Sequence, residues 1–134
     1  QHSIVQANDK GSPCKWNGVN SKRKRVIKYR VDGGIITSKA ESKCDYAVYV
    51  EGDSIYLIEL KGSNYNHALE QIDATLDKLI IAPNIETASV NGRIVLTKGR
   101  VPGIKYSKEP SLVKKLKKLN GSLDSKTRIL EEEI

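Results

Sequence analysis

Two carboxylates and an ammonium group interrupt an apolar part of the chain. Asp45 precedes the apolar run 46–50, and Glu59 and Lys61 close the next run, 55–61. If the two runs pair, the three side chains come close together. Two carboxylates repel each other unless a cation lies between them, and Mg²⁺ typically takes one or two protein carboxylates and keeps several waters. A lysine beside the metal can orient or deprotonate a water, or neutralise charge that develops on phosphorus.

The elements that must position these groups are two strands joined by the turn segment EGDS, which predicts a β-hairpin. Alternate residues of a strand share a face, so Glu59 and Lys61 should share a face with Leu57. The opposite face should enter the core, and it carries Tyr56, Ile58 and Leu60.

The register of this hairpin decides whether the carboxylates meet. A two-residue turn at Gly52 and Asp53 would pair Asp45 with Leu60 and point Asp45 away from Glu59. The site therefore requires a loop with an odd number of residues, a bulge, or a bend at Asp45. We predict that one of these is present.

The combination of Asp45, a strand, a turn, the tripeptide ELK at 59–61 and a following helix resembles the PD-(D/E)XK nuclease superfamily. The resemblance covers about residues 41–81. It implies a restriction-endonuclease-like fold in which Asp45, Glu59 and the Leu60 carbonyl bind Mg²⁺, with Mn²⁺ as a substitute. It also implies that Lys61 positions and activates the attacking water.

The sequence departs from the family pattern at two places. Cys44 stands where the family has a proline before the aspartate. Many members also carry a glutamate on a helix before the first strand, and here Glu41 is the candidate for that role, with Asp32 as second choice. Some members place a glutamine on the helix after the motif, reaching back to the active site, and Gln71 has that position.

The remaining elements follow from apolar periodicity and turn residues. A β-like run begins at Val26, and residues at helical spacing predict a helix from Asn64 or Asn66 to Pro83. A strand over 93–98 should follow an Asn91-Gly92 turn. A basic amphipathic helix should begin at Pro110 and stop at Gly121, and its inward residues should be Leu112, Val113, Leu116 and Leu119.

This order predicts an α/β (α+β) fold with a mixed β-sheet flanked by helices. The 134 residues fit one domain, 1–134, with a core over about 25–119. The segment 1–21 has weak periodicity and is expected to be irregular, and 122–134 is expected to be peripheral.

The chain is basic, with a formal net charge of +7. Such a balance favours nucleic acid or an anionic surface as partner. Two basic segments are candidates for contacts with phosphates, although a charged strand edge and a solvated helix face are the structural alternatives. Their residues are Lys22, Arg23, Lys24, Arg25, Lys28 and Arg30, and Lys114, Lys115, Lys117 and Lys118.

The two cysteines, Cys14 and Cys44, form no CxxC pair and are expected to be free thiols in a reducing, cytoplasmic compartment. No apolar run is long enough to span a bilayer, so no membrane partner is expected. The chain begins Gln-His-Ser and contains no methionine, which indicates a trimmed chain, a processed product or a piece of something longer.

Three functions are compatible with these features. The leading hypothesis is a Mg²⁺-dependent endonuclease, with DNA as the default substrate of the superfamily that the chain resembles. The second is a catalytically inactive nucleic-acid-binding module of the same fold. The third is an RNA-cleaving toxin domain of a larger protein, for which tRNA is a candidate substrate and an acidic immunity protein the expected partner. Cleavage of both DNA strands would favour a homodimer, because it needs two sites.

Overall fold

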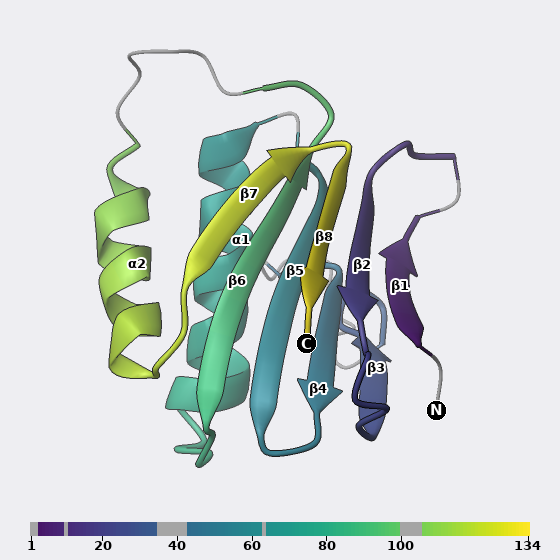
Figure 1. Cartoon of the computed structure of the whole chain (residues 1–134). Coiled ribbons are helices and arrows are strands. Elements are labelled where there is room, and N and C mark those ends of the chain that lie inside the picture. Colours follow the sequence, from purple (N-terminus) through teal and green to yellow (C-terminus); the bar gives the residue numbers. More distant parts are fainter. Residues whose placement is uncertain (1–2, 10, 35–42, 63, 100–105) are drawn as a thin grey trace.

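The computed structural model describes residues 3–9, 11–34, 43–62, 64–99 and 106–134, and the side chain of Lys61 lies outside that description. The described elements form eight strands, two α-helices and one π-helical turn (Figure 1). In chain order they are β1 (Ile4–Asn8), β2 (Lys15–Val19), β3 (Val26–Arg30), β4 (Tyr46–Val50), β5 (Ser54–Gly62), α1 (Tyr65–Leu76), the π-turn Asp77–Ile81, β6 (Ser89–Leu96), α2 (Lys108–Lys118), β7 (Leu123–Thr127) and β8 (Ile129–Glu133).

The larger sheet has five strands in the order β3-β4-β5-β6-β7. The first three strands form an antiparallel meander, whereas β5, β6 and β7 run parallel and are joined by α1 and α2. A parallel pair needs a crossover connection, and a helix is the usual one. The chain is therefore a single small α+β domain with a mixed sheet, as predicted.

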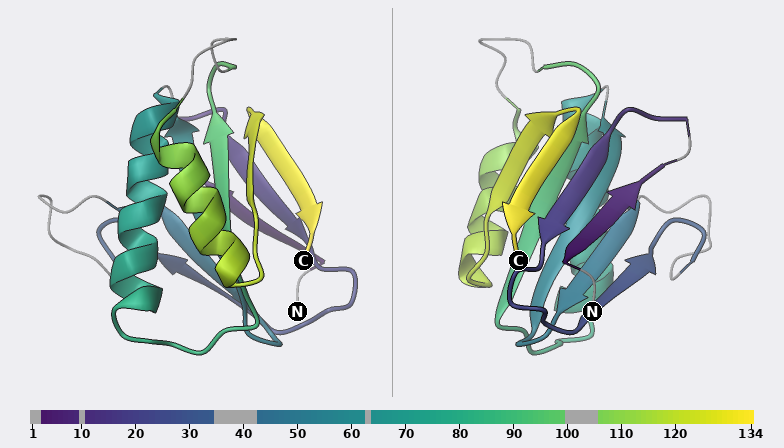
Figure 2. Two further views of the ribbon diagram at one scale, coloured as in Figure 1. Left: turned by 90° about the vertical axis from the view of Figure 1, so that its left-hand side faces the viewer. Right: turned by 45° about the vertical axis from the view of Figure 1, so that its right-hand side comes forward.

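A second, three-stranded sheet has the order β1-β2-β8 and lies on the opposite face of the large sheet from the helices (Figure 2). Both helices thus lie on one face of the large sheet, and the small sheet covers the other. Two cores result, one under the helices and one between the sheets. Strand β5 is buried on both sides, with Leu57 toward the helices and Ile58 and Leu60 toward the small sheet.

The two segments expected to be irregular or peripheral form strands, which corrects the sequence-based description. Residues 4–8 and 15–19 are β1 and β2, and most of 122–134 is β7 and β8. Trp16 is fully buried and Leu130 is 1% exposed, and both belong to the core between the sheets. The strands that carry these residues, β2 and β8, have only five residues each, which is too short for a clear periodicity. Their side chains are buried because the strands pair and pack with distant parts of the chain.

Both helices form where their periodicity predicts them. Asn64 caps α1 by accepting the N–H of His67 at 3.1 Å. Helix α2 ends in two bonds from Asn120 and Gly121 back to the carbonyls of Lys117 and Leu116, the pattern of a Schellman motif. Val113, expected to point inward, is 41% exposed. None of the described helices is long and apolar enough to cross a membrane.

The expected turn at Asn91 and Gly92 is absent, because both residues lie inside β6. Packing at Gly92 is tight. A Cβ atom at Gly92 would meet side-chain carbons of Leu123, Ile72 and Leu116 at 3.1, 3.2 and 3.2 Å. The glycine thus lets both helices pack closely on β6.

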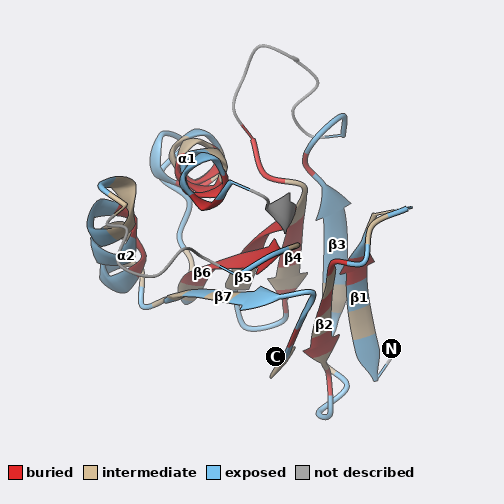
Figure 3. Ribbon diagram, turned by 90° about the horizontal axis from the view of Figure 1, so that it is seen from above, coloured by how far each residue is buried: buried red, intermediate tan, exposed pale blue. Residues whose placement is uncertain are grey.

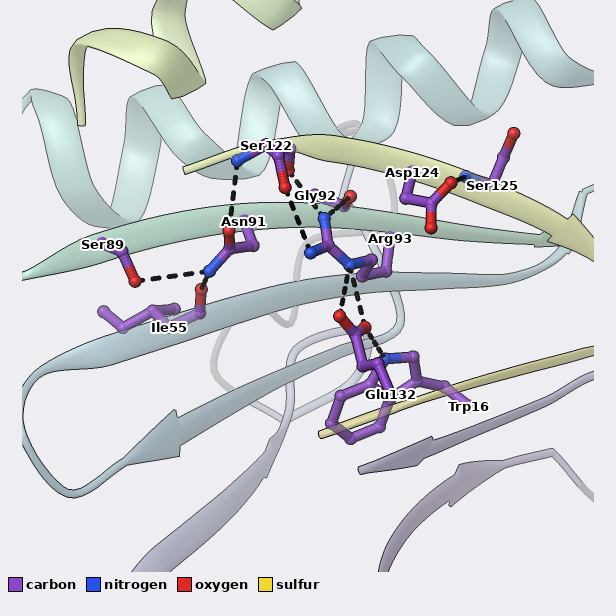
Figure 4. Close-up of polar contacts among 10 residues, drawn as sticks. All are labelled: Trp16, Ile55, Ser89, Asn91, Gly92, Arg93, Ser122, Asp124, Ser125 and Glu132. Atoms are coloured by element: carbon purple, nitrogen blue, oxygen red, sulfur yellow. Dashed lines mark hydrogen bonds and ion pairs between the residues drawn. The ribbon is translucent and has the colours of Figure 1, made fainter. Parts of the chain in front are cut away.

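A buried polar network joins β6 to the small sheet and to the segment after α2 (Figure 4). Arg93 donates from Nε to both carboxylate oxygens of Glu132 at 3.0 and 2.8 Å, and from Nη1 and Nη2 to Ser122 at 2.8 and 3.2 Å. The indole of Trp16 donates to the same carboxylate at 2.7 Å. Arg93 is only 7% exposed. This buried network therefore connects three distant parts of the chain.

Both cysteines are free, as predicted, and both are buried. Cys14 belongs to the core between the sheets and Cys44 to the core under the helices. The two thiols therefore lie on opposite faces of the large sheet, where no disulfide can join them.

Candidate active site

The hairpin β4–β5 has the odd loop that the site requires. Val50 pairs with Ser54, which leaves the three residues 51–53 in the loop. Asp53 and Gly52 have φ values of 66° and 96°, the left-handed region that such tight loops use. The same register pairs Tyr46 with Ile58, so the next step along each strand brings Asp45 beside Glu59. The prediction of an odd loop, a bulge or a bend is confirmed, and the structure has the first of these.

Asp45 is held by both neighbouring strands. Its N–H donates to the Ile58 carbonyl at 3.0 Å, and its carbonyl accepts the N–H of Val31 at 2.8 Å. Its carboxylate Oδ2 accepts the backbone N–H of Leu60 at 2.8 Å. The side chain thus bonds to a backbone N–H of β5, and this bond fixes the carboxylate at the end of that strand.

Glu59 is buried next to this carboxylate. It is 7% exposed, and its Oε1 atom has no hydrogen-bond partner within the described part of the chain. Burial raises the pKa of Glu59 from 4.5 to about 9, helped by repulsion from and a hydrogen bond with Asp45. Without a cation, Glu59 therefore holds its proton at neutral pH.

Asp45 and Glu59 are close enough to share a divalent cation. A buried polar atom without a partner is costly, and two adjacent carboxylates both ionise only when positive charge lies between them. The described residues contain no group of three or more His, Cys, Asp and Glu side chains that could hold a metal. The ligand set that the resemblance implies, Asp45, Glu59 and the Leu60 carbonyl, stays a prediction, and a set of this size suits Mg²⁺ with its several retained waters.

Of the two residues expected as a third acidic group of the site, the structure describes Asp32. Glu41 lies outside the described residues. Asp32 follows β3, its side chain is 59% exposed, and its Oδ1 lies 3.7 Å from Nζ of Lys43. Asp9, at the end of β1, was missed by sequence reasoning. Both Asp32 and Asp9 raise the pKa of Glu59, after the larger effects of burial and Asp45.

Lys61 continues β5 beyond Glu59, but its side chain lies outside the described residues. The pairing of β5 with β6 contains one extra residue between Glu59 and Gly62, so simple alternation does not continue through this segment. The catalytic role of Lys61 stays a prediction.

Helix α1 begins directly after β5 and is joined to the site through Thr75. The Thr75 hydroxyl accepts the N–H of Cys44 at 2.8 Å and donates to the Gln71 carbonyl at 2.8 Å. Cys44 precedes Asp45, so this contact fixes the entry of the chain into the site. Burial raises the pKa of the Cys44 thiol, which keeps it protonated and unreactive. A role for the Gln71 side chain stays a prediction.

The two basic segments lie at opposite edges of the large sheet. Residues 22–25 form the turn before the edge strand β3, which carries Lys28 and Arg30, whereas α2 packs on α1, β6 and β7. Lys28 donates to the Gln6 carbonyl at 2.9 Å and lies over the ring of Tyr46. A single continuous basic patch is therefore not formed by these residues.

Lys115 departs from the expectation that the lysines of α2 face solvent or phosphate. Its ammonium lies 2.9 Å from Asp73 and 3.0 Å from Asp77. Lys108 adds a third ion pair, at 3.3 Å to Asp73. These contacts join α2 to α1 and the π-turn, and the carboxylates of Asp73 and Asp77 raise the pKa of Lys115. The other three lysines of this segment, Lys114, Lys117 and Lys118, are exposed.

No protein-family model, curated protein or solved structure matches the chain.

Proposed function

We propose that the protein is a Mg²⁺-dependent nuclease that hydrolyses phosphodiester bonds, and that its active site contains Asp45 and Glu59. The observation that carries this proposal is the buried, unpartnered oxygen of Glu59 beside the fixed carboxylate of Asp45. Both groups lie at the carboxyl end of a β-strand that runs parallel to its neighbour, next to the start of a helix. Ligands of sheets with helical crossovers bind at such ends.

The chain's own residues have distinct tasks in this proposal. Asp45 enters the reaction already oriented, because the Leu60 N–H holds its Oδ2. Glu59 must lose its proton before it can act as a ligand, since burial keeps it neutral otherwise. Lys61 would orient the attacking water or neutralise charge on the phosphate. A bound Mg²⁺ would supply Lewis-acid activation of water and of the phosphate.

Substrate binding is assigned to the exposed basic residues near the edge strand β3. Arg30 is exposed and pairs with Tyr46, next to Asp45, whereas Lys22, Arg23 and Arg25 are exposed at the other end of β3, where Glu51 donates to the Arg25 carbonyl. A nucleic-acid backbone that runs along β3 would contact both ends, and such contacts bind phosphates without reading the sequence. DNA is the expected substrate and RNA the alternative.

A cleavage assay tests the proposal. Purified protein is incubated with supercoiled plasmid, single-stranded DNA and tRNA, in Mg²⁺, Mn²⁺ or EDTA. We expect cutting that requires the metal and is lost in Asp45→Ala and Lys61→Ala, whereas Lys126→Ala, a change at an exposed lysine of β7, cuts normally. Calorimetry should show Mg²⁺ binding to the wild type and none to Glu59→Gln. Normal cutting by Lys61→Ala, or metal binding by Glu59→Gln, would contradict the assignment.

One observation favours a second candidate, a binding module without catalysis. The described residues supply only two adjacent carboxylates, which can leave the metal site incomplete. Salt-sensitive binding of nucleic acid with no cutting of any substrate would support this function.

A further inference from the structure

Strand β3 forms an open edge of the large sheet. Within the residues that the structure describes, no strand pairs with its outer side. Val31, just after the strand, donates its N–H inward to the Asp45 carbonyl at 2.8 Å. Backbone groups of an antiparallel strand alternate in direction, so those of Val26 and Lys28 point outward. By the same alternation those of Arg30 point outward too, so within the described residues the edge presents three residues whose backbone donors and acceptors no strand pairs.

The two faces beside this edge differ in chemistry. Toward the small sheet, a groove of about 510 Å³ lies between β3 and β1. Its floor and walls combine apolar residues with three basic ones, namely Ile4, Val5, Val26, Lys24, Arg25 and Lys28. Toward the helices, Ile27 and Tyr29 are 41% and 43% exposed. Most of the strand lies at the surface (Figure 3). A basic groove thus runs along one side of the edge and an apolar strip along the other.

We propose that this edge binds an extended segment of a protein partner in which acidic and apolar side chains alternate. Such a segment adds a strand to the sheet through the outward groups of Val26, Lys28 and Arg30. Because successive side chains of a strand point to opposite faces, its acidic residues enter the basic groove. Its apolar residues cover Ile27 and Tyr29. This inference goes beyond the nuclease proposal and does not rest on it.

Charge, existing contacts and backbone pairing each exclude one of the simplest other occupants. Pairing of β3 with β3 of a second copy would place lysines and arginines opposite one another, which destabilises a strand pair. The chain's own acidic strand β8 is engaged, because Glu132 binds Arg93 and Glu133 accepts the Ser21 hydroxyl. A nucleic-acid strand carries no ladder of amide groups to match the edge. An acidic peptide segment satisfies both the charges and the backbone.

The test uses a blocked seven-residue peptide of alternating glutamate and valine, followed by fluorescence anisotropy and amide NMR spectra. We expect binding that shifts the amide signals of Val26, Lys28 and Arg30. Val26→Pro removes one outward N–H, and proline is tolerated at such edge positions. Binding should weaken about tenfold in Val26→Pro, as expected for one lost hydrogen bond. It should change little in Val26→Ala, which keeps the N–H.

Two control peptides keep the proposal testable even if Val26→Pro does not fold. One carries N-methyl groups on alternate residues, which removes the backbone donors, and the other carries lysine in place of glutamate. Binding by either control as strong as that of the probe would overturn the proposal. Equal binding by the proline and alanine variants, or no binding of the probe, would also overturn the proposal. Self-association through β3 would overturn it as well. The same holds if DNA and RNA, and not the peptide, shift these amide signals. Cleavage is not a readout here, so this test and that of the nuclease proposal fail independently.

Discussion

Replacing Glu59 by glutamine removes the ionisable group that the fold buries beside Asp45. Burial and the neighbouring carboxylate raise the pKa of Glu59 from 4.5 to about 9 in the folded protein. In the unfolded chain, the group ionises near its ordinary value. Between these two values the folded protein holds a proton that the unfolded chain has released. The unfolding free energy of the metal-free protein therefore decreases as the pH rises through this window.

The size of the effect follows from the shift. One pKa unit corresponds to about 1.4 kcal/mol. Relative to its value at pH 4.5, the unfolding free energy should therefore fall by about 3 kcal/mol at pH 7 and about 6 kcal/mol at pH 9 through Glu59 alone. Glutamine does not ionise, and its amide can donate a hydrogen bond to Asp45 as the protonated acid does. Glu59→Gln should remove this part of the pH dependence.

Urea unfolding in EDTA between pH 5 and pH 9 measures the effect in the wild type, Glu59→Gln and Glu86→Gln. Glu86 is exposed, so Glu86→Gln is the matched control and should follow the wild type. Glu59→Gln should be the most stable of the three at pH 8, by a margin that grows with pH. Adding Mg²⁺ at pH 8 should stabilise the wild type and the control, because a ligand that binds only the folded state raises its stability, but not Glu59→Gln.

The refuting result is a set of three parallel stability curves. In that case the Glu59 carboxyl is ionised in the folded protein without a metal, and its burial beside Asp45 does not have the electrostatic cost derived above.

Two further predictions concern the framework of the site. Arg93→Ala should destabilise the protein by about 3–5 kcal/mol in urea unfolding, because it leaves the carboxylate of Glu132 uncompensated beside the core; the double variant Arg93→Ala with Glu132→Ala should recover part of this loss, and no recovery would contradict the ion pair's role. Thr75→Val should cost about 1–3 kcal/mol, because the buried N–H of Cys44 loses its acceptor. Thr75→Ser keeps the hydroxyl and should lose much less, and equal losses in the two variants would show that packing, not the hydrogen bond, matters.

The sequence by itself determined the parts of the fold that depend on neighbouring residues. The strands around Asp45 and Glu59 have clear apolar runs, and the helix that follows has both a helical period and a capping asparagine. The need for an odd loop could also be derived without coordinates, because one residue more or less moves every side chain of a strand to the other face. Local signals of this kind suffice when an element's partners are close in sequence.

The tertiary structure decided what depends on distant segments. The short strands β1, β2 and β8 have little periodicity of their own, and they become a sheet because Trp16 and Leu130 are buried against the meander. The engagement of Lys115 by Asp73 likewise joins residues of two helices. In each case, the sequence shows the residue type but not the partner that determines its environment.

The same division applies to the candidate site. The sequence marks Asp45 and Glu59 as a pair, because their spacing fits a hairpin. Only the packed structure reduces the exposure of Glu59 to 7% and leaves its Oε1 without a partner among the described residues. It also brings Asp9 near enough for its charge to raise the pKa of Glu59. Burial is a property of everything packed around a group, including residues far away along the chain, and it is burial that raises the cost of the charge.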